Sequence, residues 1–359
     1  MLPPHRSRNE VQRSRYDLAA LAMDVGIVRL GFALSRKYRE DQPRQPAGQP
    51  EGGQWVSEGG DGGVGSLGDE PETTGTTESG VTDDGSRVLS IRVRDRRSGE
   101  WNEDHAVEAP DGTRFFFRTD GSIQSIYGGD SETLIARSVW TDRGPEPEAI
   151  AEPAFLRTPL PALPGLAPAL PSPTPSALRL YEFLAGRNAP GRTAVIGFSA
   201  REFAPAQSGA ETSPRVTWVG TLTRTEVNEA CPRHEEVQSR TDAAAETVRQ
   251  LGEYPNAAVY GTRVHTNLHG QITSLKDPDF RSEVSLMKSA REATYGRSGS
   301  IRIDVLENLR NGTVCVYDIK TGRSPLTAAR SIEIATNVRA FYPSAQRILV
   351  IETRPGMGP

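Results

Sequence analysis

The chain has 359 residues, a formal net charge of −4 and 36% hydrophobic residues, with 35 glycines and 27 prolines. This length exceeds one average domain, and the low hydrophobic content predicts folded parts joined by linkers rather than one continuous globule. Two cysteines exclude a disulfide-rich secreted scaffold and favour folding in a reducing compartment.

The first predicted element is a single amphipathic helix within residues 1–40. Its apolar run, residues 18–34, is interrupted by Asp24 and Arg29, whereas a membrane span needs about 20 mostly apolar residues. We therefore expect no stable membrane insertion and no cleaved signal peptide, with a membrane-surface role as the alternative. Residues 41–86, rich in Gly, Glu, Asp, Thr and Pro, are predicted to be a disordered linker.

Residues 87–141 are predicted to form a small β-module. Short runs rich in β-branched and aromatic residues alternate there with PDGT and TDGS turns. The proline-rich residues 142–176 exclude regular helix and predict a semi-rigid spacer. We expect the module and the segments before it to serve delivery or presentation. We also expect the module to be dispensable for chemistry, because its sequence shows no evident acid–base cluster.

Residues 177–359 are predicted to be the main folded domain, of the α/β class. Strands are expected at TAVIGFS, RVTWVGTL and RILVIETR, and helices around residues 241–251 and at LTAARSIEIATNVRAF. Residues 281–359 contain 12 Lys and Arg against 7 Asp and Glu, a net charge of +5. This local excess of positive charge suits a polyanionic partner.

The segment VYDIKTG, residues 316–322, places an acid and a base two residues apart in a strand-like run. Alternation puts Val316, Asp318 and Lys320 on one face. Burying charges is costly unless they are paired or bind something. The pattern therefore predicts either a binding site or a simple ion pair at a strand end.

The run GSIRIDVLE and the turn Asn311-Gly312 predict a hairpin that leads into VYDIKTG. With Glu307 and Thr313 as the partners that flank this loop, Asp304 lies opposite Val316 and diagonal to Asp318 on the same face. Two carboxylates placed in this way can share one divalent cation. The hairpin therefore predicts a metal site at its charged end.

Mg²⁺, or Mn²⁺ in its place, takes oxygen ligands. The expected ligands are Glu283, Asp304, Asp318 and the backbone carbonyl of Ile319, with Glu292 or Glu307 as alternatives to Glu283. Lys320 is expected to act on the attacking water or to neutralise charge that develops on a phosphate. This donor set predicts phosphodiester hydrolysis.

Glu283, Asp304 and Asp318-Ile319-Lys320, with the helix and the strand ILVIE that follow, resemble the PD-(D/E)XK nuclease superfamily. The resemblance implies a restriction-endonuclease-like mixed sheet flanked by helices, with Glu283, Asp304, Asp318 and Lys320 as catalytic residues. Over residues 254–355, YGRSGSIRIDVLE, VYDIKTG and VIETRP look more narrowly like nuclease domains at the ends of bacterial polymorphic toxins. The chain has Asp318 where Glu is also common in the superfamily.

The resemblance implies a metal-dependent DNA endonuclease, the toxin domain of an antibacterial effector. Such a protein is made in the bacterial cytoplasm and then secreted or delivered into a target cell. The implied partners are DNA, a cognate immunity protein and a component of a secretion apparatus. Two alternatives stay open: a non-catalytic adaptor on a degenerate nuclease fold, and an RNA-cleaving nuclease.

Four residues are predicted to contact nucleic acid: Arg302, Arg323, Arg330 and His265. His265 and His269 stand four residues apart and share a face if they lie on a helix. A zinc site there needs a third ligand such as His234, and the pair Cys231 and His234 lacks a second pair. The sequence therefore favours a phosphate contact for His265 over zinc.

Overall fold

In the computed structural model, the described residues are 73–95, 101–129, 133–149, 172–187, 191–205, 212–287 and 300–356. All of them belong to one compact unit, Glu70–Pro359. They form two β-sheets and five α-helices, which confirms the α/β class. The helix predicted within residues 1–40 and most of the predicted linker and spacer lie outside the described residues. Among the described helices, none is long and apolar enough to cross a membrane.

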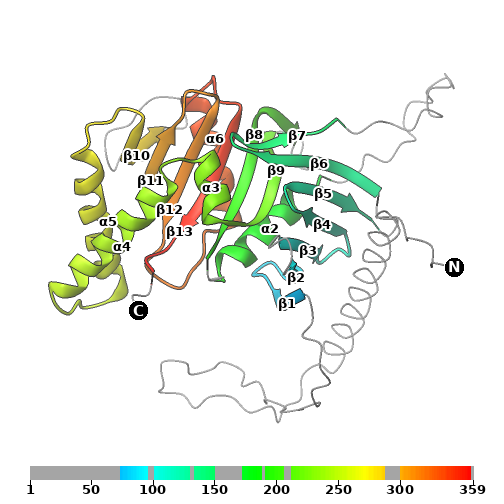
Figure 1. Ribbon diagram of the computed structural model, residues 1–359, viewed down its shortest axis with the longest axis horizontal. Helices are drawn as coiled ribbons and strands as arrows, with labels where there is room; N and C mark the ends of the chain where they lie inside the picture. The colour runs from blue at the N-terminus through cyan, green and yellow to red at the C-terminus, as the bar shows by residue number, and fades with distance from the viewer. Residues whose placement is uncertain are drawn as a thin grey trace, which may run out of the picture. The chain divides into compact units, whose positions relative to one another are not determined.

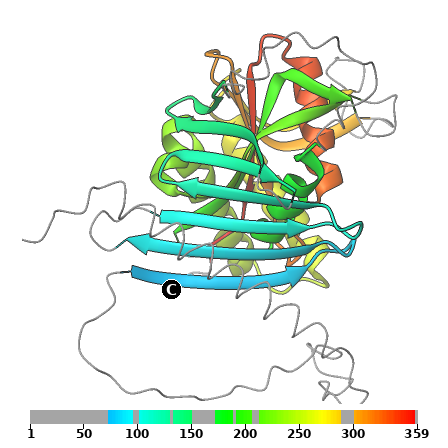
Figure 2. The ribbon, with the colours of Figure 1, turned by 90° about the vertical axis from the view of Figure 1, so that its right-hand side faces the viewer.

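The first sheet is an antiparallel meander in which each strand pairs with the next along the chain (Figure 2). Its strands are β1 Thr73–Val81, β2 Arg87–Asp95, β3 Trp101–Glu108, β4 Arg114–Asp120, β5 Ile123–Gly128, β6 Thr133–Thr141 and β7 Gly144–Pro147. The predicted β-module, residues 87–141, therefore omitted β1 at its start and β7 at its end. β1 is rich in Thr, a β-branched residue that favours strands, and β7 is an edge strand, where proline is tolerated.

The second sheet has the strand order β10-β11-β12-β13-β8-β9. Its strands are β8 Arg192–Pro205, β9 Thr212–Thr223, β10 Phe280–Met287, β11 Ser300–Asn308, β12 Thr313–Ile319 and β13 Arg347–Thr353. β12 and β13 are parallel, and the other neighbouring pairs are antiparallel. The sheet is therefore mixed, with its parallel pair at the centre, where both faces are buried.

Helices cover both faces of this second sheet (Figure 1). They are α2 Thr174–Ala185, α3 Arg224–Ala230, α4 His234–Gln250, α5 Ala257–Thr273 and α6 Ala328–Phe341. The apolar sides of α2 and α6 belong to one hydrophobic core, and those of α3, α4 and α5 belong to the other. Each core uses alternate residues of β12, so this strand lies between the two helical layers.

Polar contacts join the two sheets into one body. The Gln124 side chain of β5 accepts from the Val219 N–H at 2.9 Å and donates to the Val219 carbonyl at 2.7 Å, as a neighbouring strand would. Trp140 Nε1 donates to the Glu226 carbonyl at 3.1 Å. The predicted β-module thus packs on β9 and α3 of the predicted C-terminal domain.

Cys231 and Cys315 form a disulfide, with their Cα atoms 6.1 Å apart. The expectation of reduced cysteines was therefore wrong, and the cysteines give no support to folding in a reducing compartment. They are separated by 84 residues, and only the packing of the loop after α3 against β12 brings them together. Two isolated cysteines carry no signal of such a contact in the sequence.

The β11–β12 hairpin forms as predicted, but its register differs. Leu306, not Asp304, lies opposite Val316. Asn308 pairs with Val314, and the Leu309 N–H bonds the Thr313 carbonyl at 3.1 Å, so the loop is shorter than one flanked by Glu307 and Thr313. Arg310 and Gly312 adopt left-handed conformations in it, at φ +53° and +93°. The shorter loop shifts the pairing by two positions along β11.

Candidate functional site

The charged end of β12 is buried more deeply than predicted. Val316 belongs to one core while Tyr317 and Ile319 belong to the other, so the predicted alternation of this strand is confirmed. The side chain of Asp318 is 8% exposed, and its Oδ2 lies 2.6 Å from Lys320 Nζ. The pair is therefore not an ordinary surface ion pair, because a buried charge needs compensation from its surroundings.

Glu283 lies at an irregular position of β10. Its φ is +54°, and it is left out of a ladder that pairs Ser282 with Val305 and Val284 with Ile303. Neighbouring strand residues normally point to opposite faces, yet Ser282 Oγ lies 2.8 Å from His269 Nδ1 and Glu283 Oε1 lies 3.7 Å from His265 Nδ1. The left-handed backbone thus directs Glu283 towards α5, at a conformational cost of about 1–2 kcal/mol.

Alternation also breaks on β11, at Asp304. Ile301 and Ile303 lie in the core with α6, whereas Val305 lies in the core with α5. Asp304 Oδ1 is 3.5 Å from His265 Nδ1, and Asp304 Oδ2 accepts from the Ile319 N–H at 2.8 Å. The paired irregularities of β10 and β11 therefore place two carboxylates beside α5, next to the end of β12.

The position of His265 depends on a close approach of α5 to the segment after β12. A Cβ atom on Gly261 would lie 2.7 Å from Thr321 Oγ1, so a larger residue would push the helix away. Gly261 and His265 are four residues apart on α5 and share a face. Asn256 caps this helix by accepting from the Val259 N–H at 3.0 Å. Glycine at position 261 thus lets His265 reach the two acids.

Charges dominate the electrostatics of the cluster. Burial lowers the pKa of His265, but hydrogen bonds and charges from Asp304 and Glu283 outweigh burial and raise this pKa to about 9. Burial raises the pKa of Asp304, yet His265 and the Ile319 N–H bring it below its ordinary value. Burial, then the charge of Asp304, raises the pKa of Asp318 despite Lys320. Lys320 therefore does not fully compensate the buried charge of Asp318.

One atom each from His265, Glu283 and Asp304 all lie within 4.8 Å of one another, a spacing that can accommodate one cation. Of the predicted metal ligands, the structure brings together Glu283 and Asp304. Asp318 lies close enough for mutual charge effects but is held by Lys320, and Ile319 contributes its N–H rather than its carbonyl to the contact with Asp304. The donors that fit a cation are thus two carboxylates and one imidazole.

The alternatives considered for these ligands lie elsewhere. Glu307 bonds the Tyr317 hydroxyl at 2.7 Å, and Glu292 lies outside the described residues. His234 stacks on Tyr317, with ring centroids 6.2 Å apart, and is not part of the cluster. The acids of β10 and β11, rather than a third histidine, therefore complete the surroundings of His265.

The predicted phosphate-contact arginines lie around the cluster. Arg302 Nε is 2.9 Å from Glu283 Oε2, and its side chain is 46% exposed. Arg330 donates to the Arg302 carbonyl and lies 2.7 Å from Glu333, and its charge acts on Asp318. Arg323 is exposed on the segment after β12. His265 lies beside Glu283 and Asp304, neighbours that the sequence did not predict for it.

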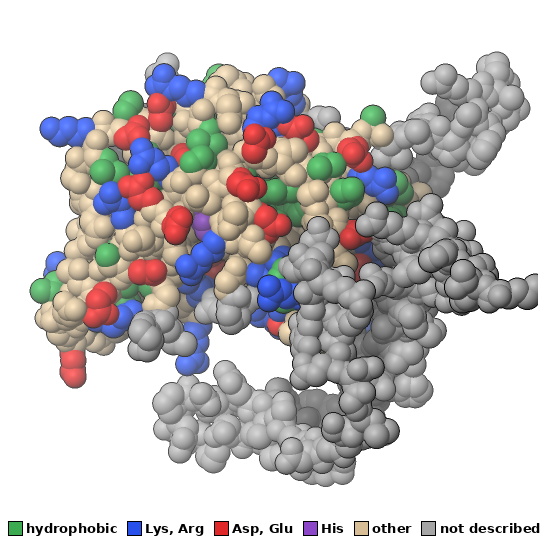
Figure 3. All heavy atoms as spheres, viewed as in Figure 1, with side chains coloured by type: hydrophobic (Ala, Val, Ile, Leu, Met, Phe, Trp, Pro, Cys, Tyr) green, Lys and Arg blue, Asp and Glu red, His purple; other side chains and the backbone are tan. Residues whose placement is uncertain are grey.

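Two surface hollows of the described part lie away from this cluster. One, of about 240 Å³, is lined by Arg233, Phe280 and Arg310, and the other, of about 640 Å³, by Arg201, Arg339 and Pro343. On the face in Figure 3, acidic and basic side chains are interspersed over the described residues. Neither hollow is lined by Glu283, Asp304, Asp318 or His265.

Comparisons with protein-family models, curated proteins and solved structures found no match to this chain.

Proposed function

We propose that this protein is a metal-dependent endonuclease that hydrolyses phosphodiester bonds of DNA. The observation that carries the proposal is the meeting of Glu283, Asp304 and His265 beside the buried pair of Asp318 and Lys320. Perturbed clusters of titratable groups more often mark functional sites than structural ones. Arginines around the cluster suit the phosphates of a nucleic acid.

The order of elements supports assignment to the PD-(D/E)XK superfamily. α5 is followed by the antiparallel strands β10, β11 and β12, then by α6 and by β13, which is parallel to β12. Asp304 lies on the second of these strands, and Asp318 and Lys320 lie at the end of the third. This arrangement matches the helix–strand order that the resemblance implies and keeps the restriction-endonuclease-like fold as the proposal.

Glu283, Asp304 and His265 would hold the metal, with Asp318 adjacent. A bound divalent cation polarises a phosphoryl oxygen and lowers the pKa of its water. Imidazole suits Mn²⁺ better than Mg²⁺, which prefers oxygen ligands alone, so Mn²⁺ should support activity at least as well as Mg²⁺. Lys320, which lies 2.6 Å from Asp318, would neutralise charge that develops on the phosphate.

As a toxin domain, such a nuclease would need a neutralising partner in the cell that makes it. Arg302, Arg323 and Arg330 provide positive charge around the site. An acidic immunity protein that covers this region is the complementary surface. Delivery through a secretion apparatus belongs to the same proposal.

The test is incubation of the purified full chain with supercoiled plasmid and, in parallel, with structured RNA. Each reaction contains Mg²⁺, Mn²⁺ or a chelator. We expect nicking and linearisation of plasmid with either metal and none with chelator. Cleavage of RNA alone would transfer the proposal to an RNase, and absence of cleavage with every metal would favour a non-catalytic adaptor.

A further inference from the structure

Residues 320–327 connect β12 to α6, and this segment has no regular secondary structure. It begins at Lys320, carries the exposed Arg323 and ends at Thr327, whose side chain caps α6 by accepting from the Arg330 N–H. The segment therefore carries or borders three basic residues of the candidate site. Its backbone groups need partners from outside a helix or strand.

Two residues at the end of β13 supply these partners. Glu352 Oε2 accepts from the Leu326 N–H at 2.6 Å. The guanidinium of Arg354 donates to the Gly322 carbonyl and, at 3.2 Å, to the Ser324 carbonyl. One acid and one base, two residues apart, thus hold the segment at three points.

Glu352 and Arg354 also hold each other. Arg354 Nε lies 2.6 Å from Glu352 Oε1, and their side chains are 16% and 2% exposed, respectively. Gln238 on α4 donates to the Arg354 carbonyl at 2.7 Å, which fixes the backbone of Arg354. A guanidinium can bond a carboxylate and two carbonyls at once because its five N–H groups form a planar fork.

We propose that Glu352 and Arg354 are positioning residues that hold residues 320–327 in place, so that Lys320 stays beside Asp318 and Arg323 faces the nucleic acid. This inference rests on the proposed nuclease function and gives a role to VIETRP, which that function leaves unexplained. The Lys320 N–H donates to the Thr353 carbonyl at 2.9 Å, and Thr353 stands between Glu352 and Arg354 in the sequence. Movement of Glu352 or Arg354 would therefore displace Lys320 directly.

The segment is held on its other side by α5. Thr321 lies against Gly261, on the helix that carries His265. The Glu352–Arg354 pair thus fixes the position of Lys320 relative to the acids beside α5. Misplacement of a reacting group by about 1 Å can cost on the order of 100-fold in rate, even when the cause is remote from the chemistry.

The experiment compares wild type with Arg354→Ala and Arg354→Lys in the full chain. Arg310→Ala is the matched control, because Arg310 also pairs with an acid, Asp279 at 2.8 Å, but on the loop at the other end of the β11–β12 hairpin. Hydrogen exchange of a peptide that contains Leu326 reports whether the segment is held. Single-turnover plasmid cleavage at saturating DNA and DNA binding without metal report on the site.

In Arg354→Ala we expect faster exchange at Leu326 and a fall in the cleavage rate of about 10- to 100-fold. DNA affinity should fall by a smaller factor than the cleavage rate, because Arg323 contributes to binding whereas Lys320 acts in the transition state. Arg354→Lys keeps a charge beside Glu352 but cannot bond two carbonyls, so it should rescue neither readout fully. Arg310→Ala should match wild type in both.

Full rescue by Arg354→Lys would overturn the inference, since a charge alone would then suffice. Unchanged cleavage in Arg354→Ala, with wild type active, would overturn it while leaving the proposed nuclease intact. If wild type cleaves neither DNA nor RNA, the proposed function falls and the positioning role falls with it. Unchanged exchange at Leu326 in Arg354→Ala would independently show that the pair does not hold the segment.

Discussion

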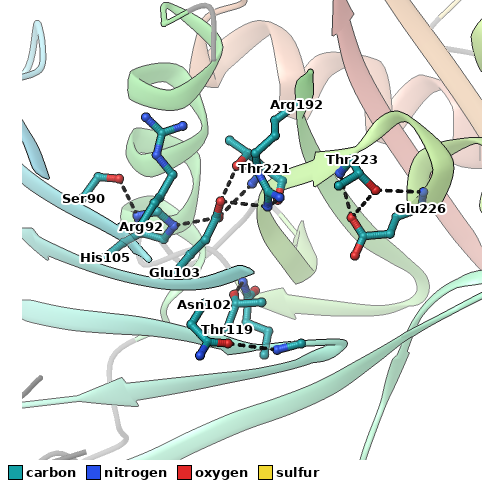
Figure 4. A network of polar contacts seen from close by, with 12 residues as sticks. Ser90, Arg92, Asn102, Glu103, His105, Thr119, Arg192, Thr221, Thr223 and Glu226 are labelled. Carbon is teal, nitrogen blue, oxygen red and sulfur yellow. Dashed lines mark hydrogen bonds and ion pairs between the residues drawn. The ribbon is translucent and has the colours of Figure 1, made fainter. Parts of the chain in front are cut away.

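Two buried histidine–carboxylate clusters in this protein differ in the balance between acids and donors. Between the sheets, Glu103 of β3 accepts from the Thr221 N–H at 3.1 Å and from the Thr221 hydroxyl (Figure 4). It also pairs with Arg192 at 2.9 Å and lies 3.2 Å from His105. His105 in turn lies 3.0 Å from Ser90. One acid is thus surrounded by donors on every side.

The cluster at the end of β12 brings together three acids instead of one. Glu283, Asp304 and Asp318 share His265, Lys320 and Arg302, and the pKa of Asp318 is raised by burial and by the charge of Asp304. Around Glu103, by contrast, burial is outweighed by hydrogen bonds and charges from His105 and Arg192, which lower the pKa to about 2. A single acid surrounded by donors indicates a structural contact, whereas several acids brought together leave room for a cation.

Glu103→Ala should produce the largest effect on stability. It leaves the buried Arg192 without its carboxylate, and removal of one partner of a buried pair costs about 3–5 kcal/mol of the free energy of unfolding. Urea unfolding followed by tryptophan fluorescence measures this loss. Glu246→Ala is the control, because Glu246 forms only an exposed helical pair with Arg249. A loss below about 1 kcal/mol for Glu103→Ala would show that this network does not join the sheets.

Lys320→Ala should produce the largest effect on activity, as Glu103→Ala does on stability. We expect plasmid cleavage to fall by about 10²-fold or more, because a stabiliser of transition-state charge is lost, with metal binding nearly unchanged. Asp318→Ala should instead weaken both metal binding and cleavage. Lys320→Arg should rescue poorly, since a planar fork does not replace a compact ammonium.

Calorimetry with Mn²⁺ and single-turnover cleavage distinguish these variants. Lys276→Ala, at an exposed lysine after α5, is the matched control and should cleave like wild type. If Lys320→Ala and Asp318→Ala both cleave DNA like wild type, Asp318 and Lys320 form only a structural ion pair.

The contrast between the two clusters also explains what the sequence could reveal. Asp318 and Lys320 were predictable because β12 keeps strict alternation. The approach of Glu283 and Asp304 to His265 was not, because alternation fails at both acids and the left-handed backbone of Glu283 leaves no signal in a single sequence. Gly261, four residues before His265, was the available clue to a close helix contact.

The Glu103 network was invisible for a different reason. Its partners Arg192 and Thr221 lie 89 and 118 residues further along the chain, and a proline-rich segment separates them from β3. Composition correctly indicates strands in the first sheet but says nothing of what covers them. For the same reason, the sequence suggested a separate module where the structure has one packed unit.

The pH dependence of stability should centre on His265. Its folded pKa is about 9, above the ordinary 6.5, so its contribution is fully present below pH 6.5 and is lost as the pH rises towards 9. Without metal, we expect a fall on the order of 1–2 kcal/mol across this range. Thermal or urea unfolding in chelator at pH 6, 7, 8 and 9 measures it.

His265→Gln should abolish this fall, whereas His269→Gln, one turn along α5, should preserve it. His269 contacts Ser282 rather than the two acids and is therefore a matched control. An equal fall in wild type and His265→Gln would show that another group is responsible and that His265 is not held by the carboxylates.

The smallest expected effect has the opposite sign to that of Glu103→Ala. Because the folded pKa of Asp318 is raised above its ordinary value of 3.8, the ionised form is disfavoured in the folded state at neutral pH. Asp318→Asn removes this charge, and Lys320 can keep water contact since its side chain is 29% exposed. We expect the free energy of unfolding at pH 7 to rise by about 0.5–1 kcal/mol, in the range of common stabilising substitutions, while cleavage is lost. Stability from a raised carboxyl pKa is present at low pH and is lost as the pH rises through that pKa, so the gain should shrink as the pH is lowered.

Urea unfolding of both proteins at pH 7 and pH 4.5 measures this difference. If Asp318→Asn instead destabilises the protein by about 2 kcal/mol or more, Asp318 resembles Glu103, a carboxylate that the fold itself requires.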